Sequence, residues 1–130
     1  MQLFIVRHAE AAPGEPDDLR PLTKAGREQA RRLGRQLADD GIQPDAVLSS
    51  PLLRARETAV AIAKAVGGEV ETDDRLAPGA DPDDVRAAAA GRGATVVVVG
   101  HQPDCGRAVA ALSGGREPAF PPGGVVAVEV

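Results

Sequence analysis

The chain has 130 residues, a length that fits one domain over residues 1–130 and leaves little room for a second. Apolar residues make up 43% of it, close to the norm for globular proteins, which argues against disorder. The 15 basic and 19 acidic residues give a formal charge of -4, a balance that argues against a protein coating nucleic acid or an anionic membrane.

Cysteine use and hydropathy indicate the compartment. Cys105 is the only cysteine, so no intramolecular disulfide can form, and a reducing cytoplasm is the natural setting. Residues 1–6 are too short for a secretory signal peptide, and no apolar run approaches membrane-spanning length. We therefore expect a cytoplasmic protein that binds neither membrane nor nucleic acid.

Strands and helices alternate in the first half of the chain. Residues 3–6 form a β-rich run that predicts a buried strand. After a loop rich in Pro, Gly and Asp, apolar residues at helical spacing predict a helix over residues 23–40, with threonine as its N-cap. Residues 45–49 predict a second strand. Serine followed by proline is a favoured helix start, so the next helix is predicted over residues 50–66.

The second half continues the alternation. Residues 69–72 indicate an edge strand, and residues 81–90 a shorter helix. Residues 95–99 are the clearest buried strand, because they hold four consecutive valines. A helix around residues 105–112 and a last strand over residues 125–130 follow. This order predicts an α/β fold: a three-layer α/β/α sandwich with a mostly parallel sheet.

Basic and imidazole side chains follow the predicted strands. Arg7 and His8 come directly after the first strand, and His101 follows the valine strand. Arg54 lies near the start of the helix that follows the second strand. Because the carboxyl ends of parallel strands meet at one edge of the sheet, we expect these four side chains to converge.

Two histidines and two arginines suit phosphoryl transfer. Arginine presents a fixed fork of donors that matches phosphate oxygens. A neutral imidazole can attack phosphorus, and nearby guanidinium groups disfavour protonation of His8, leaving its nitrogen free. The positive groups can neutralise the phosphate without a metal ion, and two histidines without a clear carboxylate partner make a poor zinc site.

Four ordered blocks of sequence carry a resemblance to a known family. They are Val6-Arg7-His8-Ala9-Glu10, Arg20-Pro21-Leu22-Thr23, Ser49-Ser50-Pro51-Leu52-Leu53-Arg54-Ala55 and Val99-Gly100-His101. Together they resemble the histidine phosphatase (phosphoglycerate mutase-like) superfamily. The short chain and the Arg-Pro-Leu-Thr step are most similar to its SixA-type phosphohistidine phosphatases.

The resemblance implies a phosphoglycerate mutase-like fold and a role for each matching residue. His8 would be the phosphorylated nucleophile, and Arg7 and Arg54 would clamp the phosphate. His101 would be a further donor to the phosphate, and Arg20 an additional substrate contact. The family needs no metal and no organic cofactor, so none is expected.

One departure from the family pattern bears on the substrate. Larger relatives carry a Leu-x-Glu step whose glutamate donates the leaving-group proton, whereas this chain has Leu76-Ala77-Pro78. A phosphoramidate nitrogen accepts a proton more easily than an alkoxide, so a missing acid fits phosphohistidine better than a sugar phosphate. The carboxylates that remain as candidate acids are Glu10, Asp17, Asp18, Asp81 and Asp104.

The sequence therefore predicts a phosphatase for phosphohistidine in proteins, such as a histidine-containing phosphotransfer protein. The short segment over residues 67–94 has no large lid and leaves room for a protein substrate. Two alternatives stay open: a phosphatase of a small phosphomonoester such as a sugar or nucleotide phosphate, and a non-catalytic phosphate-binding or scaffold module. The pattern indicates no oligomeric state. Cys105 is interpreted as core packing, and four arginines as a solvated helix face: Arg27, Arg31, Arg32 and Arg35.

Overall fold

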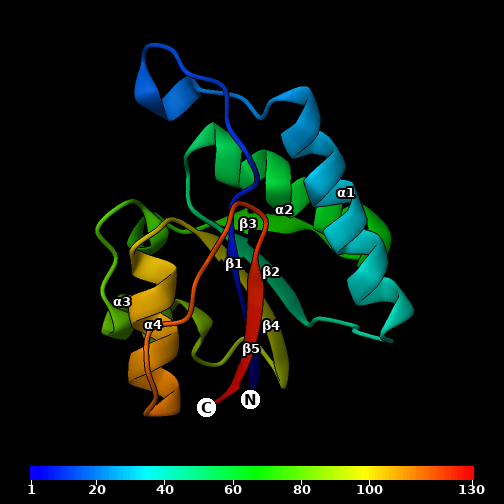
Figure 1. Cartoon of the computed structure of the whole chain (residues 1–130). Helices are drawn as coiled ribbons and strands as arrows, with labels where there is room; N and C mark the ends of the chain where they lie inside the picture. The colour runs from blue at the N-terminus through cyan, green and yellow to red at the C-terminus, as the bar shows by residue number, and fades with distance from the viewer.

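The sheet has five strands, in a computed structural model that describes residues 1–130. Their order is β3-β2-β4-β1-β5. Strands β1 (Gln2–Arg7), β2 (Ala46–Ser49), β3 (Val70–Thr72) and β4 (Thr95–Gly100) run parallel, and β5 (Val125–Glu129) pairs antiparallel with β1. The mostly parallel sheet is confirmed, with β4 at its centre and β3 at one edge (Figure 1).

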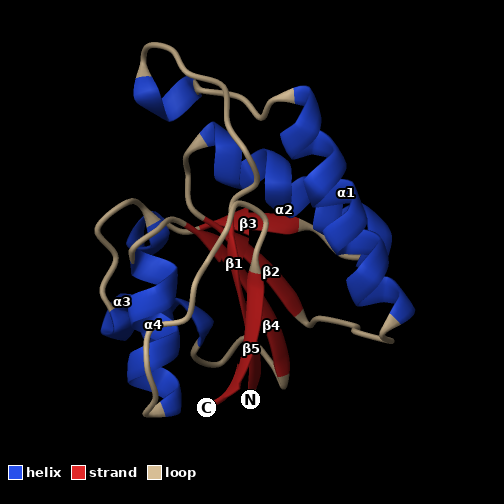
Figure 2. Cartoon of the chain, in the orientation of Figure 1, coloured by secondary structure: helices blue, strands red, loops and turns tan.

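Helices cover both faces of the sheet, as Figures 1 and 2 show. Helices α1 (Lys24–Asp39) and α2 (Leu53–Val66) pack on one face, and α3 (Pro82–Ala89) and α4 (Asp104–Ser113) on the other. Each helix pair encloses its own buried cluster of apolar side chains with one face of the sheet. The predicted three-layer α/β/α sandwich is therefore confirmed.

The central strands explain why their sequences are apolar at every position. Phe4 and Val97 point into the cluster beneath α1 and α2, whereas Ile5 and Val98 point into the cluster beneath α3 and α4. Successive side chains of a strand alternate between faces, so a strand buried on both sides needs consecutive apolar residues.

Local signals fix the other boundaries. The Thr23 hydroxyl accepts a hydrogen bond from the Gly26 N–H, which caps α1 as predicted. Asp81 and Asp84 form a reciprocal capping box at the start of α3. The sequence did not indicate two single-turn 3-10 helices, which lie in loops over Asp17–Leu19 and Asp74–Leu76.

The predicted start of α2 at Ser50 and Pro51 is wrong, because the helix begins at Leu53. The Ser50 N–H donates to the Val99 carbonyl, so Ser50 still continues the pairing of β2 with β4. Leu52 is also extended, with a ψ of 141°, and its N–H donates to the Ser50 hydroxyl at 3.2 Å. The serine therefore caps the turn before the helix and leaves its own backbone in the sheet.

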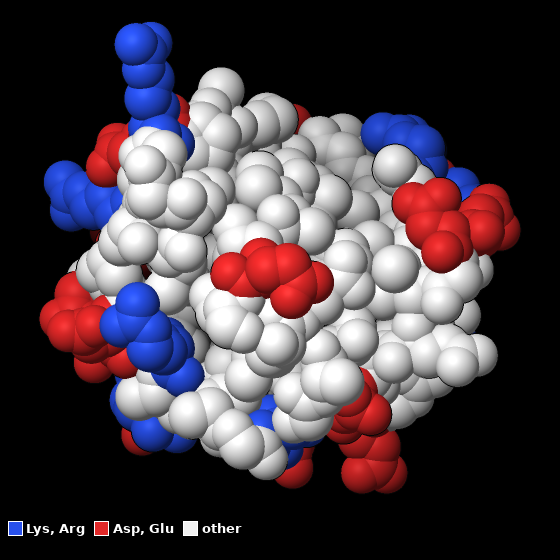
Figure 3. Space-filling model, turned by 90° about the horizontal axis from the view of Figure 1, so that it is seen from below, with Lys and Arg blue, Asp and Glu red and all other residues white.

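The two chain ends lie together at the end of the molecule where the parallel strands begin (Figure 1). The Met1 amino group donates to the Val130 carbonyl at 2.8 Å. Seen from this end, the surface is largely uncharged, with most ionic side chains around its rim (Figure 3). None of the helices is long and apolar enough to cross a membrane.

Candidate active site

The carboxyl ends of β1 and β4 place the two histidines side by side. Arg7 pairs in register with Gly100, and the His8 N–H donates to the Gly100 carbonyl at 3.0 Å. His101 directly follows Gly100, so both imidazoles leave neighbouring strands at the same level. Their ring centroids are 5.2 Å apart with a tilt of 59°.

One hydrogen bond fixes the protonation pattern of His8. Its Nδ1 lies 2.7 Å from the Ala9 carbonyl oxygen. Because a carbonyl can only accept, Nδ1 carries the hydrogen and Nε2 carries the lone pair. The pKa of His8 is lowered, mainly by burial and then by the charges of Arg54, Arg7 and Arg20, although the Ala9 bond opposes the shift. His8 is therefore a neutral imidazole with a free Nε2 near neutral pH.

His101 is also neutral and is oriented by a serine. Its Nε2 lies 2.8 Å from the Ser50 hydroxyl, and both side chains are buried. Burial first, and then the charges of His8 and Arg54, lower the pKa of His101 to about 3. The Ser50 hydroxyl accepts from the Leu52 N–H, so its own hydrogen is free to donate to His101 Nε2. In that arrangement Nδ1 of His101 carries a hydrogen.

Arg7 links the site to the segment before β5. Its Nη1 donates to the Phe120 carbonyl at 2.8 Å. The Gly123 N–H in turn donates to the carbonyls of Arg7 and His8. Sequence reasoning gave this segment no role, and it supports the strand end that carries both residues.

Asp17 joins the two remaining arginines. Arg54 donates from Nη1 to the Asp17 carbonyl at 2.9 Å and from Nη2 to its carboxylate at 3.3 Å. Arg20 donates to the other carboxylate oxygen at 2.9 Å and, from Nε, to the Ala12 carbonyl. These hydrogen bonds, with that to Arg20 first, hold the pKa of Asp17 below its usual value. The structure thus brings Arg20 and Arg54 to the same carboxylate, that of Asp17.

Three buried donors have no hydrogen-bond partner: Nε of Arg7, Nδ1 of His101 and Nε of Arg56. The first two belong to residues beside His8. A buried donor without an acceptor costs about 1–3 kcal/mol, so an anion with several oxygens would complete this arrangement.

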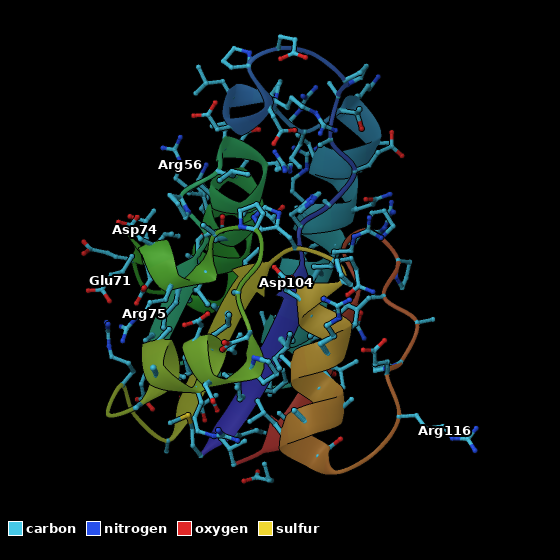
Figure 4. The ribbon with its side chains drawn as sticks, turned by 90° about the vertical axis from the view of Figure 1, so that its left-hand side faces the viewer. Arg56, Glu71, Asp74, Arg75, Asp104 and Arg116 are labelled. Carbon is cyan, nitrogen blue, oxygen red and sulfur yellow. The ribbon has the colours of Figure 1, made fainter.

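Three of the four other candidate carboxylates have structural partners. Asp81 belongs to the capping box of α3, and Glu10 accepts from the Thr23 hydroxyl. Asp104 lies at the start of α4 (Figure 4), where its carboxylate accepts from the Gly79 N–H and ties down the loop before α3. Asp18 has no hydrogen bond or ion pair through its side chain.

Cys105 is buried among the apolar side chains of α3 and α4. Burial raises the pKa of its thiol to about 12, so a nucleophilic thiolate is absent at neutral pH. Its interpretation as core packing fits this position. The structure shows no group of three or more His, Cys, Asp or Glu side chains that could hold a metal ion.

Comparison with known proteins places this chain in a family. Residues 3–78 match the model of the Histidine phosphatase superfamily (branch 1). The chain is 34% identical over 125 residues to phosphohistidine phosphatase SixA of Escherichia coli K12, covering 91% of this chain and 78% of that protein. An uncharacterized protein of Picosynechococcus sp. is 36% identical over 124 residues, covering 89% of this chain and 75% of the relative.

The fold agrees with these matches. The structure of the protein histidine phosphatase SixA complexed with tungstate superimposes with a TM-score of 0.90 at 30% identity, covering 100% of this chain and 88% of that one. The chain therefore belongs to the histidine phosphatase superfamily, and the resemblance found in the sequence blocks is confirmed.

Proposed function

We propose that the chain is a phosphatase that hydrolyses phosphohistidine in proteins through a phosphorylated His8. The orientation of His8 carries this proposal, because its Nδ1 is held by the Ala9 carbonyl and its Nε2 keeps the lone pair. SixA, which resembles this chain over most of its length, is named a phosphohistidine phosphatase. Its complex with tungstate, an oxyanion of phosphate-like shape, supports a phosphate site in the same fold.

The reaction takes two steps, and His8 carries the phosphoryl group between them. In the first, the His8 Nε2 lone pair forms a bond to phosphorus while the P–N bond of the substrate breaks. That bonding pair goes to the substrate imidazole, which takes a proton from solvent water on its other ring nitrogen and leaves neutral. In the second, water attacks the phosphorus on His8, inorganic phosphate leaves, and His8 recovers its lone pair.

The positive groups stabilise the charge on the transferring phosphoryl oxygens. Arg54 and Arg7 supply guanidinium donors, and Arg20 adds a third at the outer rim. Nδ1 of His101 supplies a neutral donor, because its low pKa keeps the ring uncharged. Three guanidinium groups supply the charge that a metal ion would otherwise bring, so we propose that neither a metal nor an organic cofactor is needed.

We propose no carboxylic acid as the proton donor to the leaving group. The pKa of Asp17 is lowered, which makes it a poor proton donor at neutral pH. An imidazole leaves without a strong acid more readily than an alkoxide, which favours phosphohistidine over a phosphomonoester. We place this activity in a single domain over residues 1–130 and in the cytoplasm.

The experiment is phosphate release from a phosphohistidine peptide by the native chain and by His8→Ala, with a chelator present. We expect turnover by the native chain and none by the variant. Turnover that survives His8→Ala would place the chemistry elsewhere. Brisk hydrolysis of sugar phosphates without release from phosphohistidine would favour a small phosphomonoester, and tight phosphate binding without turnover would favour a binding module.

A further inference from the structure

A groove runs between α1 and α2 on the outer side of the molecule. It has a volume of about 550 Å³, and six of its 12 lining residues are apolar, Leu22, Leu53 and Val60 among them. Figure 1 shows the two helices next to each other, away from the end of the molecule where the two chain ends lie. Val60 is one of three large apolar residues that the chain exposes, at 42%.

Small side chains explain why the groove forms there. A Cβ at Gly34 of α1 would lie 2.9 Å from the Ala61 carbonyl and 3.0 Å from the Ala65 Cβ, both in α2. The helices therefore approach closely, and Ala30, Ala61 and Ala65 leave a shallow valley above the contact. Longer side chains on either side of this valley then form its walls.

The walls carry an excess of positive charge. Five lining residues are basic and one is acidic, on a chain whose formal charge is -4. Arg31 pairs with Glu28, whereas Arg35, Arg56 and Lys64 form no ion pair. Nε of Arg56, which lies toward the upper end of α2 in Figure 4, is buried without a hydrogen-bond partner. The arginines predicted to form a solvated face thus include members that border a hollow.

The groove begins beside the candidate active site. Leu53 and Arg56 line the groove at the start of α2, and they flank Arg54 in the first turn of that helix. The lining positions of α2 continue to Ala65, which is a length of about 18 Å at 1.5 Å per residue. A partner helix of about three turns would fill this length, with one end next to Arg54 of the candidate active site.

We propose that this groove binds an acidic amphipathic helix of the phosphorylated protein substrate, adjacent to its phosphohistidine. The inference rests on the proposed function and adds the kind of substrate. Apolar residues of the partner would cover Val60 and the valley. Its carboxylates would meet Arg35, Arg56 and Lys64, the cations without partners. Charge of opposite sign would also speed encounter and select against basic partners.

Two synthetic phosphohistidine peptides of equal length test the groove. Both place apolar residues at helical spacing beside the phosphohistidine, and one carries glutamates where the other carries glutamines. We expect the native chain to favour the glutamate peptide in kcat/KM by about tenfold, mainly through KM, from two or more exposed charge contacts. In Arg35→Glu/Lys64→Glu this preference should disappear, while hydrolysis of free phosphohistidine stays unchanged.

The matched control is Arg107→Glu/Arg116→Glu, which changes net charge equally at exposed positions outside the groove; Figure 4 shows Arg116 projecting away from Arg56. This control should keep the preference for the glutamate peptide. Equal kcat/KM for both peptides in the native chain, or a preference that survives Arg35→Glu/Lys64→Glu, would overturn the inference.

Failure of the proposed function gives a different pattern. If the phosphatase proposal fails, the native chain releases no phosphate even from free phosphohistidine. Anisotropy of the fluorescent, unphosphorylated glutamate peptide then reports on the groove without turnover. Binding that Arg35→Glu/Lys64→Glu weakens, and the control does not, supports an acidic partner helix; no binding, or equal binding by both variants, overturns it.

Discussion

The hydroxyl of Thr58 accepts a hydrogen bond from the Ala9 N–H at 3.0 Å, although the two residues are 49 positions apart. The same hydroxyl donates to the Arg54 carbonyl at 2.9 Å, one helical turn earlier in α2. Thr58 is fully buried. One side chain thereby connects the backbone beside His8 to the turn that carries Arg54.

Replacing Thr58 with valine should separate these two parts of the site. Valine keeps the shape but leaves the buried Ala9 N–H without an acceptor, which should lower the free energy of unfolding by about 1–3 kcal/mol. Because the Ala9 carbonyl also holds His8, we expect kcat for phosphate release to fall by roughly tenfold, the effect of a small misplacement. Urea unfolding and single-substrate kinetics measure the two effects.

Thr58→Ser is the matched control, since it keeps the hydroxyl and removes the methyl group. It should lose stability through its small cavity and retain most of kcat. If Thr58→Val and Thr58→Ser show the same kcat, the hydroxyl does not position His8.

Thr58 also shows where prediction from sequence stops. The strand ends that carry Arg7, His8 and His101 could be predicted, because hydrophobic patterning locates buried strands and parallel strands share one edge. The hydrogen bond between Thr58 and Ala9 could not, because it depends on which residue of α2 faces β1. The nearest signal was the position of Thr58 four residues after Arg54, on the same side of the helix.

The predicted start of α2 was wrong for a related reason. Serine and proline are good starting residues for a helix, but the Ser50 N–H donates to the Val99 carbonyl of β4, and this tertiary contact overrides the local preference. The role of Asp17 could not be predicted from the sequence either. It was one of five candidate acids in the sequence, and only the loop conformation brings it to Arg54 and Arg20.

Replacing Asp17 with asparagine should strengthen the binding of inorganic phosphate. The Asp17 carboxylate accepts hydrogen bonds from Arg54 and Arg20, the same donors that a phosphate would use. Its side chain is 62% exposed, so the competing contact is a modest one. We expect the inhibition constant of phosphate to fall by roughly three- to fivefold, measured as product inhibition.

Asp18→Asn makes the same charge change one residue away, where no hydrogen bond reaches either arginine. It should leave phosphate inhibition close to that of the native chain. Weaker phosphate binding by Asp17→Asn would show instead that the carboxylate holds Arg54 in its working position.

His101 should make the fold sensitive to acid. Its pKa is about 3 in the folded chain against an ordinary value of 6.5, so between these values the unfolded chain binds a proton that the folded chain does not. The contribution of His101 to stability is therefore complete above pH 6.5 and is lost as the pH falls toward 3. The slope from this group is at most about 1.4 kcal/mol per pH unit.

Urea unfolding of the native chain and of His101→Gln, between about pH 7 and pH 5, isolates this effect. Glutamine does not titrate, so the unfolding free energy of the native chain, relative to that of His101→Gln, should decrease as the pH falls. Parallel curves would mean that His101 titrates alike in the folded and unfolded chains. A proton NMR titration of the His101 ring should show no transition near 6.5 in the folded protein.

Gly26→Ala should damage both stability and activity. In an exposed helix this change would stabilise by about 1 kcal/mol, but a Cβ at Gly26 would overlap the Glu10 carbonyl oxygen. That oxygen already accepts from the Thr23 N–H, so α1 and the segment after His8 cannot simply move apart. We expect a net loss of about 1–3 kcal/mol in unfolding free energy and a lower kcat, because Glu10 lies two residues from His8.

Gly115→Ala, in an exposed loop with its nearest neighbour at 3.4 Å, is the control and should change neither the unfolding free energy nor kcat. Unchanged stability of Gly26→Ala would mean that the helix can shift away from Glu10, and the close contact would then not fix the position of the strand end.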